Sequence, residues 1–445
     1  MKRPKLLMDA LNNRALAIPI FLLVLFFMFA TTLKVGGFLS TLLERGIQRI
    51  FIDEMILFFH SKIPLYLEST MIGVCLGIKI AISFLPIIFI LYFFMTTLEE
   101  SGYMTRTEFM LGKILGKLAL PGRAVIPLIL GFGCNVPAIL ATRIIPHKPS
   151  RIVTIAMIPF MSCGARLTVF VMFCSVFLVH SMSVVMLLYL GGVIVAFGVG
   201  YALKNFFKMY AIEISMEQKL PEYRIPNFYS VAQQSFRETR NFILDIGKTV
   251  IIVTAIVNLL NNIDTSPHTK VNNQISQSIN FDRTSLLKTT AQFLTPALKP
   301  MGVTQDNWPA IMGLLSGVLA KEVILVTLNT IYAAENLHGN YQQLINEKFD
   351  NQASLLAYLL FILLYFPCIS VFSVIKKELG SIYAWSIAIG STLLAYAAGS
   401  IFYQLCALTN AYGFGVIMIL NFLGSCLLIA LIPGFAILFH KAARS

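Results

Sequence analysis

Three cysteines stand where long apolar stretches are interrupted by glycine or proline. Cys134 lies in GFGCNVP, Cys163 in PFMSCGAR and Cys368 in LYFPCIS. Glycine lets a backbone approach a ligand closely, and proline removes a helical hydrogen bond. We therefore expect carbonyl groups without helical partners near these thiols. Thiols beside such carbonyls suit a borderline or soft divalent metal, so these three cysteines are candidate metal ligands.

The alternative for a cysteine in an apolar stretch is that it is a small buried packing residue. This is our interpretation of the other cysteines, which lack a comparable setting: Cys75, Cys174, Cys406 and Cys426.

Two adjacent charged residues, Lys321 and Glu322, lie in the apolar stretch AKEVILVTLNTIY. An ionisable residue at such a place is a functional candidate. We expect Glu322 to be a cation ligand or proton acceptor and Lys321 to balance charge or anchor the segment, with a structural ion pair as the alternative. Arg166 follows Cys163 by three residues and is expected to have a structural or gating role. The same role is expected of residues in and around these motifs: Gly131, Gly133, Asn135, Pro137, Asn329 and Pro367.

The composition decides the class of protein that must position these residues. The chain has 445 residues, of which 57% are hydrophobic and only 12% are charged, whereas soluble chains carry roughly a quarter charged residues. Several uncharged runs exceed about 18 residues, enough to cross a bilayer. The sequence therefore predicts an all-α polytopic membrane protein. The net charge of +13 is assigned to connections that set orientation and meet the lipid bilayer, and no nucleic acid partner is expected.

Charge distribution predicts how the chain crosses the membrane. If residues 124–142 crossed it, the basic connection 204–240 would face outward, against the positive-inside rule. If this segment enters and returns, the basic connections face the cytoplasm. The same argument applied to residues 308–332 places both termini in the cytoplasm. The prediction is about eight transmembrane helices and two re-entrant segments, one from each face, as in inverted-repeat transporters.

Three parts of the chain follow from this topology: a cytoplasmic tail (1–14), a first half (15–240) with its re-entrant segment at about 124–142, and a second half (241–445) with its re-entrant segment at about 308–332. A helix within residues 36–69 is expected to lie in the outer interface. The predicted spans are about 15–33, 71–98, 152–179, 183–203, 241–260, 354–375, 382–405 and 414–439.

Motifs for enzymatic chemistry are missing from the sequence. Gly247-Lys248-Thr249 is similar to the end of a phosphate-binding loop, but position 242 is Phe where that motif requires Gly. Neither HExxH nor GxSxG occurs. We therefore expect no enzyme and no GTP site in this chain.

The motifs resemble, in order, those of the membrane domain of the FeoB family of bacterial ferrous iron transporters. The matching stretches are LEESGYMTR (98–106), GFGCNVPAILATR (131–143), PFMSCGARL (159–167), AKEVILVTLNTIY (320–332) and LYFPC (364–368). The resemblance implies that Fe(II) is the transported substrate and that the protein lies in the bacterial cytoplasmic (inner) membrane. It places Cys134, Cys163 and Cys368 near the iron path, and Glu322 with them. Small cytoplasmic accessory Feo proteins are the implied partners.

Members of this family usually begin with a cytoplasmic GTP-binding domain, whereas this sequence starts about where their membrane portion would. The resemblance therefore implies a GTPase on another chain, or on a part of the protein outside this sequence. Thr168 stands where the family motif has proline. A homo-oligomer is compatible with the sequence. The rival interpretations are a gate-type transporter of another solute, such as Mn(II), Zn(II) or a nucleoside, and a membrane scaffold or sensor that does not transport.

Overall fold

The computed structural model describes residues 23–47, 71–102, 120–177, 181–207, 226–248, 251–252, 286–328, 348–349, 351–409 and 415–431, apart from single residues or pairs within these ranges. The predicted tail 1–14 and most of the long connections lie outside the described residues. So do two of the candidate site residues, Glu322 and Asn329.

The described residues form helices, together with one isolated antiparallel bridge between Val303 and Phe349. Four helical stretches in this part of the chain are long and apolar enough to cross a membrane: Lys148–Cys174, Met182–Phe206, Gln352–Leu379 and Ser381–Leu408. They coincide closely with four of the predicted spans. The prediction of an all-α polytopic membrane protein is thereby confirmed.

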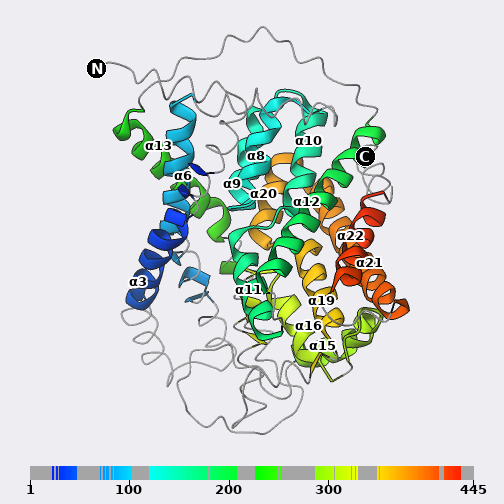
Figure 1. The fold of residues 1–445 in the computed structure, drawn as a ribbon. Helices are drawn as coiled ribbons and strands as arrows, with labels where there is room; N and C mark the ends of the chain where they lie inside the picture. Colours follow the sequence, from blue (N-terminus) through cyan, green and yellow to red (C-terminus); the bar gives the residue numbers. More distant parts are fainter. Residues whose placement is uncertain are drawn as a thin grey trace, which may run out of the picture. The chain divides into compact units, whose positions relative to one another are not determined.

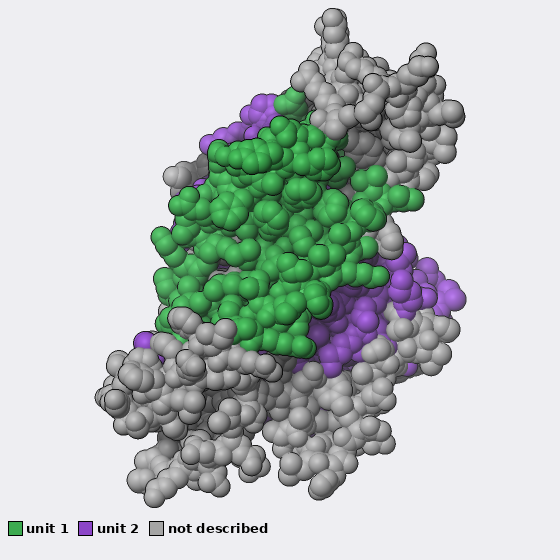
Figure 2. All heavy atoms as spheres, turned by 90° about the vertical axis from the view of Figure 1, so that its left-hand side faces the viewer, with its two compact units in different colours: residues 1–63, 74–126, 210–252 green, residues 64–73, 127–209, 253–445 purple. Residues whose placement is uncertain are grey.

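The described chain forms two compact units, which Figure 2 shows in separate colours. Unit 1 contains residues 1–63, 74–126 and 210–252, and unit 2 contains residues 64–73, 127–209 and 253–445. The predicted division into the halves 15–240 and 241–445 is a division by topology, and it stays a prediction.

Unit 1 is built around α6 (Leu85–Glu100), which packs against η1 (Thr32–Gly36), α3 (Gly37–Ile47) and α13 (Phe228–Phe242). It also contains η3 (Gly122–Ala124). Gly36 permits the close approach of η1 to α6, because a Cβ there would lie 3.0 Å from the Ile87 Cα. The position of α3 in an outer interface stays a prediction.

Helix α13 begins earlier than the sequence predicts. The basic connection 204–240 was expected to end at a span starting near residue 241, but a helix runs from Phe228 through Phe242 and continues as η6 (Ile243–Gly247). Asn227 is the N-cap of this helix, because its side-chain oxygen accepts a hydrogen bond from the Tyr229 N–H at 3.2 Å. Further contacts at the helix start come from outside the segment. The Glu100 carboxylate accepts hydrogen bonds from the Asn227 backbone N–H (3.3 Å) and from the Ser230 hydroxyl (3.1 Å), and an acidic group at a helix N-terminus stabilises it.

Unit 2 is centred on α19 (Gln352–Leu364), in which every residue from Ala353 to Leu364 is buried. Its capping box fixes the start, because Asn351 and Ser354 exchange side-chain and backbone hydrogen bonds. Helices α11 (Gly164–Phe177), α12 (Ser181–Phe206) and α21 (Ser381–Leu408) pack against α19, and α22 (Val416–Leu431) packs on α12 and α21. Helices α15 (Leu286–Leu294), η7 (Thr295–Met301) and α16 (Trp308–Ser316) also belong to this unit.

Small residues on α12 let neighbouring elements approach its backbone. A Cβ on Gly191 would lie 2.7 Å from the Phe422 ring of α22, and a Cβ on Gly192 would lie 2.7 Å from the Phe160 carbonyl oxygen. Such small residues are the usual means of close helix packing in membranes. Gly192 therefore fixes the chain just before Cys163.

Candidate metal site at two helix breaks

The first break lies between two short helices, α8 (Val125–Leu130) and α9 (Asn135–Ala141). Neither is long enough to cross a bilayer. Gly131 is required in the turn because a Cβ there would lie 3.0 Å from the Met161 Cβ. Cys134 has an extended backbone (φ −151°, ψ 127°) and stands at the N-cap of α9, with Asn135 and Pro137 in the first turn. The gating or structural role expected of Gly133 and Pro137 stays a prediction.

A second break divides the spanning stretch 148–174. Helix α10 (Lys148–Met157) continues as η5 (Ile158–Phe160), and α11 begins at Gly164. Cys163 lies in the non-helical part, near the middle of the stretch. The Gly164 N–H donates a hydrogen bond of 3.2 Å to the Gly133 carbonyl. Cys134 and Cys163 therefore flank one hydrogen bond between the two breaks.

The same arrangement recurs later in the chain. Helix α16 ends at Ser316 and is followed by a turn, while α19 ends at Leu364 and α20 (Ile369–Leu379) begins after Cys368. The Ile369 N–H donates a hydrogen bond of 2.8 Å to the Val318 carbonyl. In both places, the residue after a cysteine donates to a carbonyl in the preceding turn.

The two broken helices run in opposite directions within unit 2. In Figure 1, α10 lies above α11 whereas α20 lies above α19, so the first descends in chain order and the second ascends. This antiparallel repetition of the broken helix agrees with the predicted inverted repeat. Whether the two hairpins re-enter the membrane stays a prediction.

Two buried cations bind the carbonyl groups that the breaks leave outside the helices. Arg166 is 1% exposed, and its Nη1 donates to the carbonyls of Pro159 (2.8 Å) and Met161 (3.4 Å). Lys321 is 4% exposed, and its Nζ donates to the Phe366 carbonyl at 2.8 Å.

Lys321 also lies over an aromatic ring, with Nζ 3.4 Å from the centroid of Tyr365. A cation–π contact of this kind offsets part of the cost of burying an ammonium group. The Tyr365 hydroxyl donates to the Leu314 carbonyl at 3.3 Å. Tyr365 thus connects the second break to α16.

The sequence predicts carbonyls without helical partners near Cys134. The carbonyls that the structure describes at the breaks are paired, and those of Gly133 and Met161 accept from groups outside a regular helix. The Gly133 carbonyl accepts from Gly164, the Cys134 carbonyl accepts from the Ala138 N–H at 3.4 Å, and the Met161 carbonyl accepts from Arg166. The physical reason is that an unpaired carbonyl in an apolar interior is costly. Among the described residues at the breaks, the buried side-chain atoms without a hydrogen-bond partner are Asn135 Oδ1, Ser162 Oγ and Arg166 Nε.

The Cys368 thiol lies close enough to Cys163, Arg166 and Lys321 to interact with them electrostatically. Tyr189 of α12 belongs to this group too, since it interacts with Cys163 and Arg166, and its ring stacks on Phe132 with centroids 6.2 Å apart. Within the described residues, no three His, Cys, Asp or Glu side chains lie close enough together to hold a metal ion. The ligand role of the cysteines therefore stays a prediction, as does that of Glu322.

Ser162, Tyr189 and Tyr365 were not predicted from the sequence. Ser162 and Tyr365 stand within three residues of Cys163 and Cys368, and that proximity was the available signal. Tyr189 lies on a different helix, and nothing local marks it. Cys174, Cys406 and Cys426 are buried and free, as expected of packing residues.

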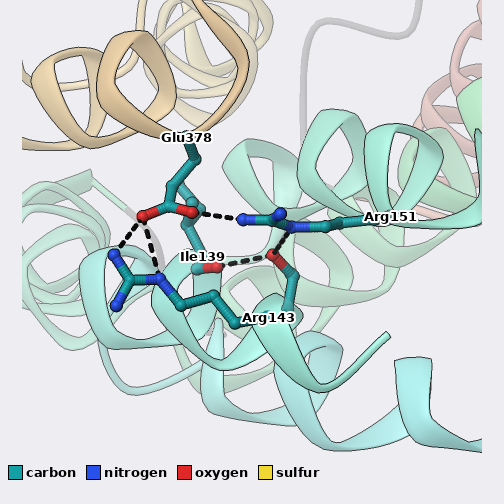
Figure 3. Close-up of polar contacts among 5 residues, drawn as sticks. Ile139, Arg143, Arg151 and Glu378 are labelled. Carbon is teal, nitrogen blue, oxygen red and sulfur yellow. Dashed lines mark hydrogen bonds and ion pairs between the residues drawn. The ribbon is translucent and has the colours of Figure 1, made fainter. Parts of the chain in front are cut away.

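An ion-pair cluster lies at the other end of α9 and α20 (Figure 3). The Glu378 carboxylate, in the last turn of α20, accepts from Arg143 Nε at 3.0 Å and Nη2 at 2.5 Å, and from Arg151 Nη2. Arg143 belongs to η4 (Thr142–Ile144), which follows α9, and Arg151 to α10. The cluster ties α20 to the hairpin that carries Cys134.

The Thr142 hydroxyl extends this cluster. It donates to the Ile139 carbonyl at 2.6 Å and accepts from Arg151 Nε at 3.4 Å. His147 caps α10 nearby, because its Nδ1 accepts from the Ser150 N–H at 3.4 Å.

Comparison with family models decides the family of the chain. Residues 81–177 and 243–382 match the Gate model, described as "Nucleoside recognition", and residues 185–237 match the model "Ferrous iron transport protein B C terminus". The chain belongs to the FeoB family. No solved structure matches it.

Two relatives of this FeoB-family chain illustrate the similarity. A protein named "Fe(2+) transporter FeoB" from Legionella pneumophila subsp. pneumophila (strain Philadelphia 1) is 33% identical over 446 residues, which cover 88% of this chain and 58% of the relative. Its namesake from Salmonella typhimurium (strain LT2) is 32% identical over 469 residues, which cover 92% of this chain and 58% of the relative. The chain thus spans somewhat over half the length of these relatives.

Proposed function

We propose that this chain is the permease part of a ferrous iron transporter and that it carries Fe(II) into the cell. The observation that carries the proposal is the position of Cys163 and Cys368, each at a break near the middle of a membrane-spanning stretch and each held by a matching backbone hydrogen bond. The names of the relatives, Fe(2+) transporter FeoB, support Fe(II) as the substrate.

The chemistry follows from the charges around the thiols. Arg166 and Lys321 are buried positive groups in the same neighbourhood, so a divalent cation needs anionic ligands to stay there. Thiolate sulfur is the metal-binding form of cysteine. Fe(II) exchanges water for the sulfurs of Cys163 and Cys368, with Cys134 and Glu322 as further ligands of the path.

Weak, successive coordination suits a transported ion. A site that transports must bind well enough to admit the ion and weakly enough to release it. Because no three of these ligand types in the described residues lie at metal-binding distance from one another, we propose that the thiols contact the ion in turn as the two breaks change their spacing.

The cellular setting belongs to the same proposal. The chain lies in the bacterial cytoplasmic membrane with both termini in the cytoplasm, as the charge distribution predicts. A GTPase, on another chain or on a part of the protein outside this sequence, controls it, and small accessory Feo proteins bind its cytoplasmic connections. It contains no nucleotide site of its own, and it functions as a transporter and not as an enzyme.

The test is Fe(II) flux into proteoliposomes that hold the full chain, with and without a FeoB GTPase domain added in trans. Cys163→Ser and Cys368→Ser should each reduce flux at least tenfold, whereas Cys174→Ser should leave it unchanged. Cys174 is a matched control because it is a buried thiol on α11, the helix that begins after Cys163. Normal flux in both site variants would refute the ligand assignment.

A second candidate function is transport of another solute, because the Gate model that matches the chain is described as "Nucleoside recognition". A competition assay distinguishes Fe(II) transport from transport of another solute. Excess Mn(II), Zn(II) or nucleoside is added to the Fe(II) flux assay, and inhibition only by nucleoside, with nucleoside flux of its own, would replace the iron proposal. No flux of any solute, with or without the GTPase domain, would favour a scaffold or sensor.

A further inference from the structure

The two buried cations of unit 2 occupy matching places at the two breaks. Arg166 donates to the carbonyls of Pro159 (2.8 Å) and Met161 (3.4 Å), and Met161 stands two residues before Cys163. Lys321 donates to the carbonyl of Phe366, which stands two residues before Cys368. Each thiol thus follows a carbonyl group that a cation holds.

The two cations come from different positions of the repeat. Arg166 lies three residues after its cysteine, where the second repeat has Val371. Val318 and Gly133 correspond, because each accepts from the residue after a cysteine. Lys321 lies three residues after Val318, whereas the residue three after Gly133 is Val136. The backbone hydrogen bond is the same in both repeats, but the cationic residue stands at a different sequence position in each. What the two repeats share is a cation that binds the carbonyl two residues before the cysteine.

A full charge is a costly way to satisfy a carbonyl in an apolar interior, because burying a cation carries a large desolvation cost. A long side chain has one advantage here. Lys321 reaches a carbonyl 45 residues away in sequence, and its ammonium is held over Tyr365 in the same break. It therefore joins the turn after α16 to the segment that carries Cys368.

We infer that Arg166 and Lys321 are a pair of positioning residues, each of which holds the break that carries one thiol: Arg166 for Cys163 and Lys321 for Cys368. This inference rests on the proposed function only in that the thiols are the metal ligands. The positioning itself does not depend on which ion is carried.

Hydrogen–deuterium exchange of the full chain tests the pairing without any metal. Lys321→Met should speed exchange in peptides covering 366–370 about tenfold, the change that 1.4 kcal/mol produces, and leave peptides covering 161–165 unchanged. Arg166→Met should do the reverse. Lys321→Arg and Arg166→Lys keep a donor and a charge, and should restore most of the protection.

A second readout separates positioning from a general structural role. Co(II), used as a probe in place of Fe(II), gives a charge-transfer absorption with thiolate ligands. Lys321→Met should lose as much of this absorption as Cys368→Ser does, and Arg166→Met as much as Cys163→Ser. If Lys321→Met does not purify as a folded protein, Lys321→Gln, which keeps one amide donor, takes its place.

The exchange and absorption measurements distinguish the possible outcomes. The crossed pattern in both readouts supports the pairing. Equal acceleration at both breaks in each variant, or no change at either, overturns it. If the wild-type chain transports no Fe(II), the proposed function fails, and the exchange pattern still decides whether the two cations hold the breaks.

Discussion

The ion-pair cluster around Glu378 gives a prediction whose size follows from exposure. Glu378→Gln keeps the shape of the side chain and one acceptor oxygen but removes the charge that two arginines share. The Glu378 side chain is 6% exposed, that of Arg151 is 25% exposed and that of Arg143 is 54% exposed. The two halves of the cluster should therefore contribute unequally to stability.

The magnitude can be worked out for each half. A hydrogen bond to a charged group contributes about 1.5–3 kcal/mol, and an exposed ion pair about 0.2–1 kcal/mol. Arg151 belongs nearer the first range and Arg143 to the second. We expect Arg151→Gln to lower the free energy of unfolding by about 2 kcal/mol, Arg143→Gln by less than about 1 kcal/mol, and Glu378→Gln by about 2–3 kcal/mol.

The assay is reversible unfolding of the purified chain in detergent micelles, with a double-mutant cycle on Glu378 and each arginine. High salt should weaken the Arg143 coupling more than the Arg151 coupling, since exposed pairs are screened. Two results would refute the reasoning: a loss at Arg143→Gln equal to that at Arg151→Gln, or a loss below about 1 kcal/mol at Glu378→Gln.

Two further substitutions test the packing and the capping of the helices around the breaks. Gly192→Ala should destabilise the protein by about 1–3 kcal/mol, because its Cβ would lie 2.7 Å from the Phe160 carbonyl oxygen. Gly424→Ala on α22 is the control, because no atom lies within 4 Å of the Cβ position there. This control should be neutral or slightly stabilising in the same unfolding assay. Asn351→Ala should cost about 0.5–2 kcal/mol, because α19 loses the side chain that accepts from the Ser354 N–H at 2.8 Å, and Asn351→Asp, which keeps an acceptor, should lose much less; equal losses in the two variants would contradict the capping argument.

Local sequence was enough to predict where the helices break. Gly131, Gly133 and Pro367 mark two of the breaks, because glycine and proline change the backbone wherever they stand. The apolar runs likewise predicted the spans around α12, α19 and α21, since their length and composition are local properties. In each of the three motifs the candidate thiol lies directly before the first residue of a helix.

The partners across the fold could not be predicted in this way. The hydrogen bond from Ile369 to Val318 and the bond from Lys321 to Phe366 join segments more than forty residues apart. The contact of Glu100 with the start of α13 joins it to Asn227, 127 residues later. Such contacts depend on which turn meets which break, and a single sequence does not encode that in any local pattern. The groups that pair with the Gly133 and Val318 carbonyls could not be predicted for this reason.

Helix α20 connects Cys368 mechanically to the ion-pair cluster around Glu378. Its eleven residues make a rod of about 16 Å, with Cys368 directly before one end and Glu378 in the last turn at the other. A rod that tilts by about 10° about its Glu378 end moves the opposite end by about 3 Å. That displacement exceeds the length of a typical metal–sulfur bond, about 2.3 Å in zinc sites. A small rotation of α20 about its charged end is therefore enough to bring its thiol to an ion or to take it away.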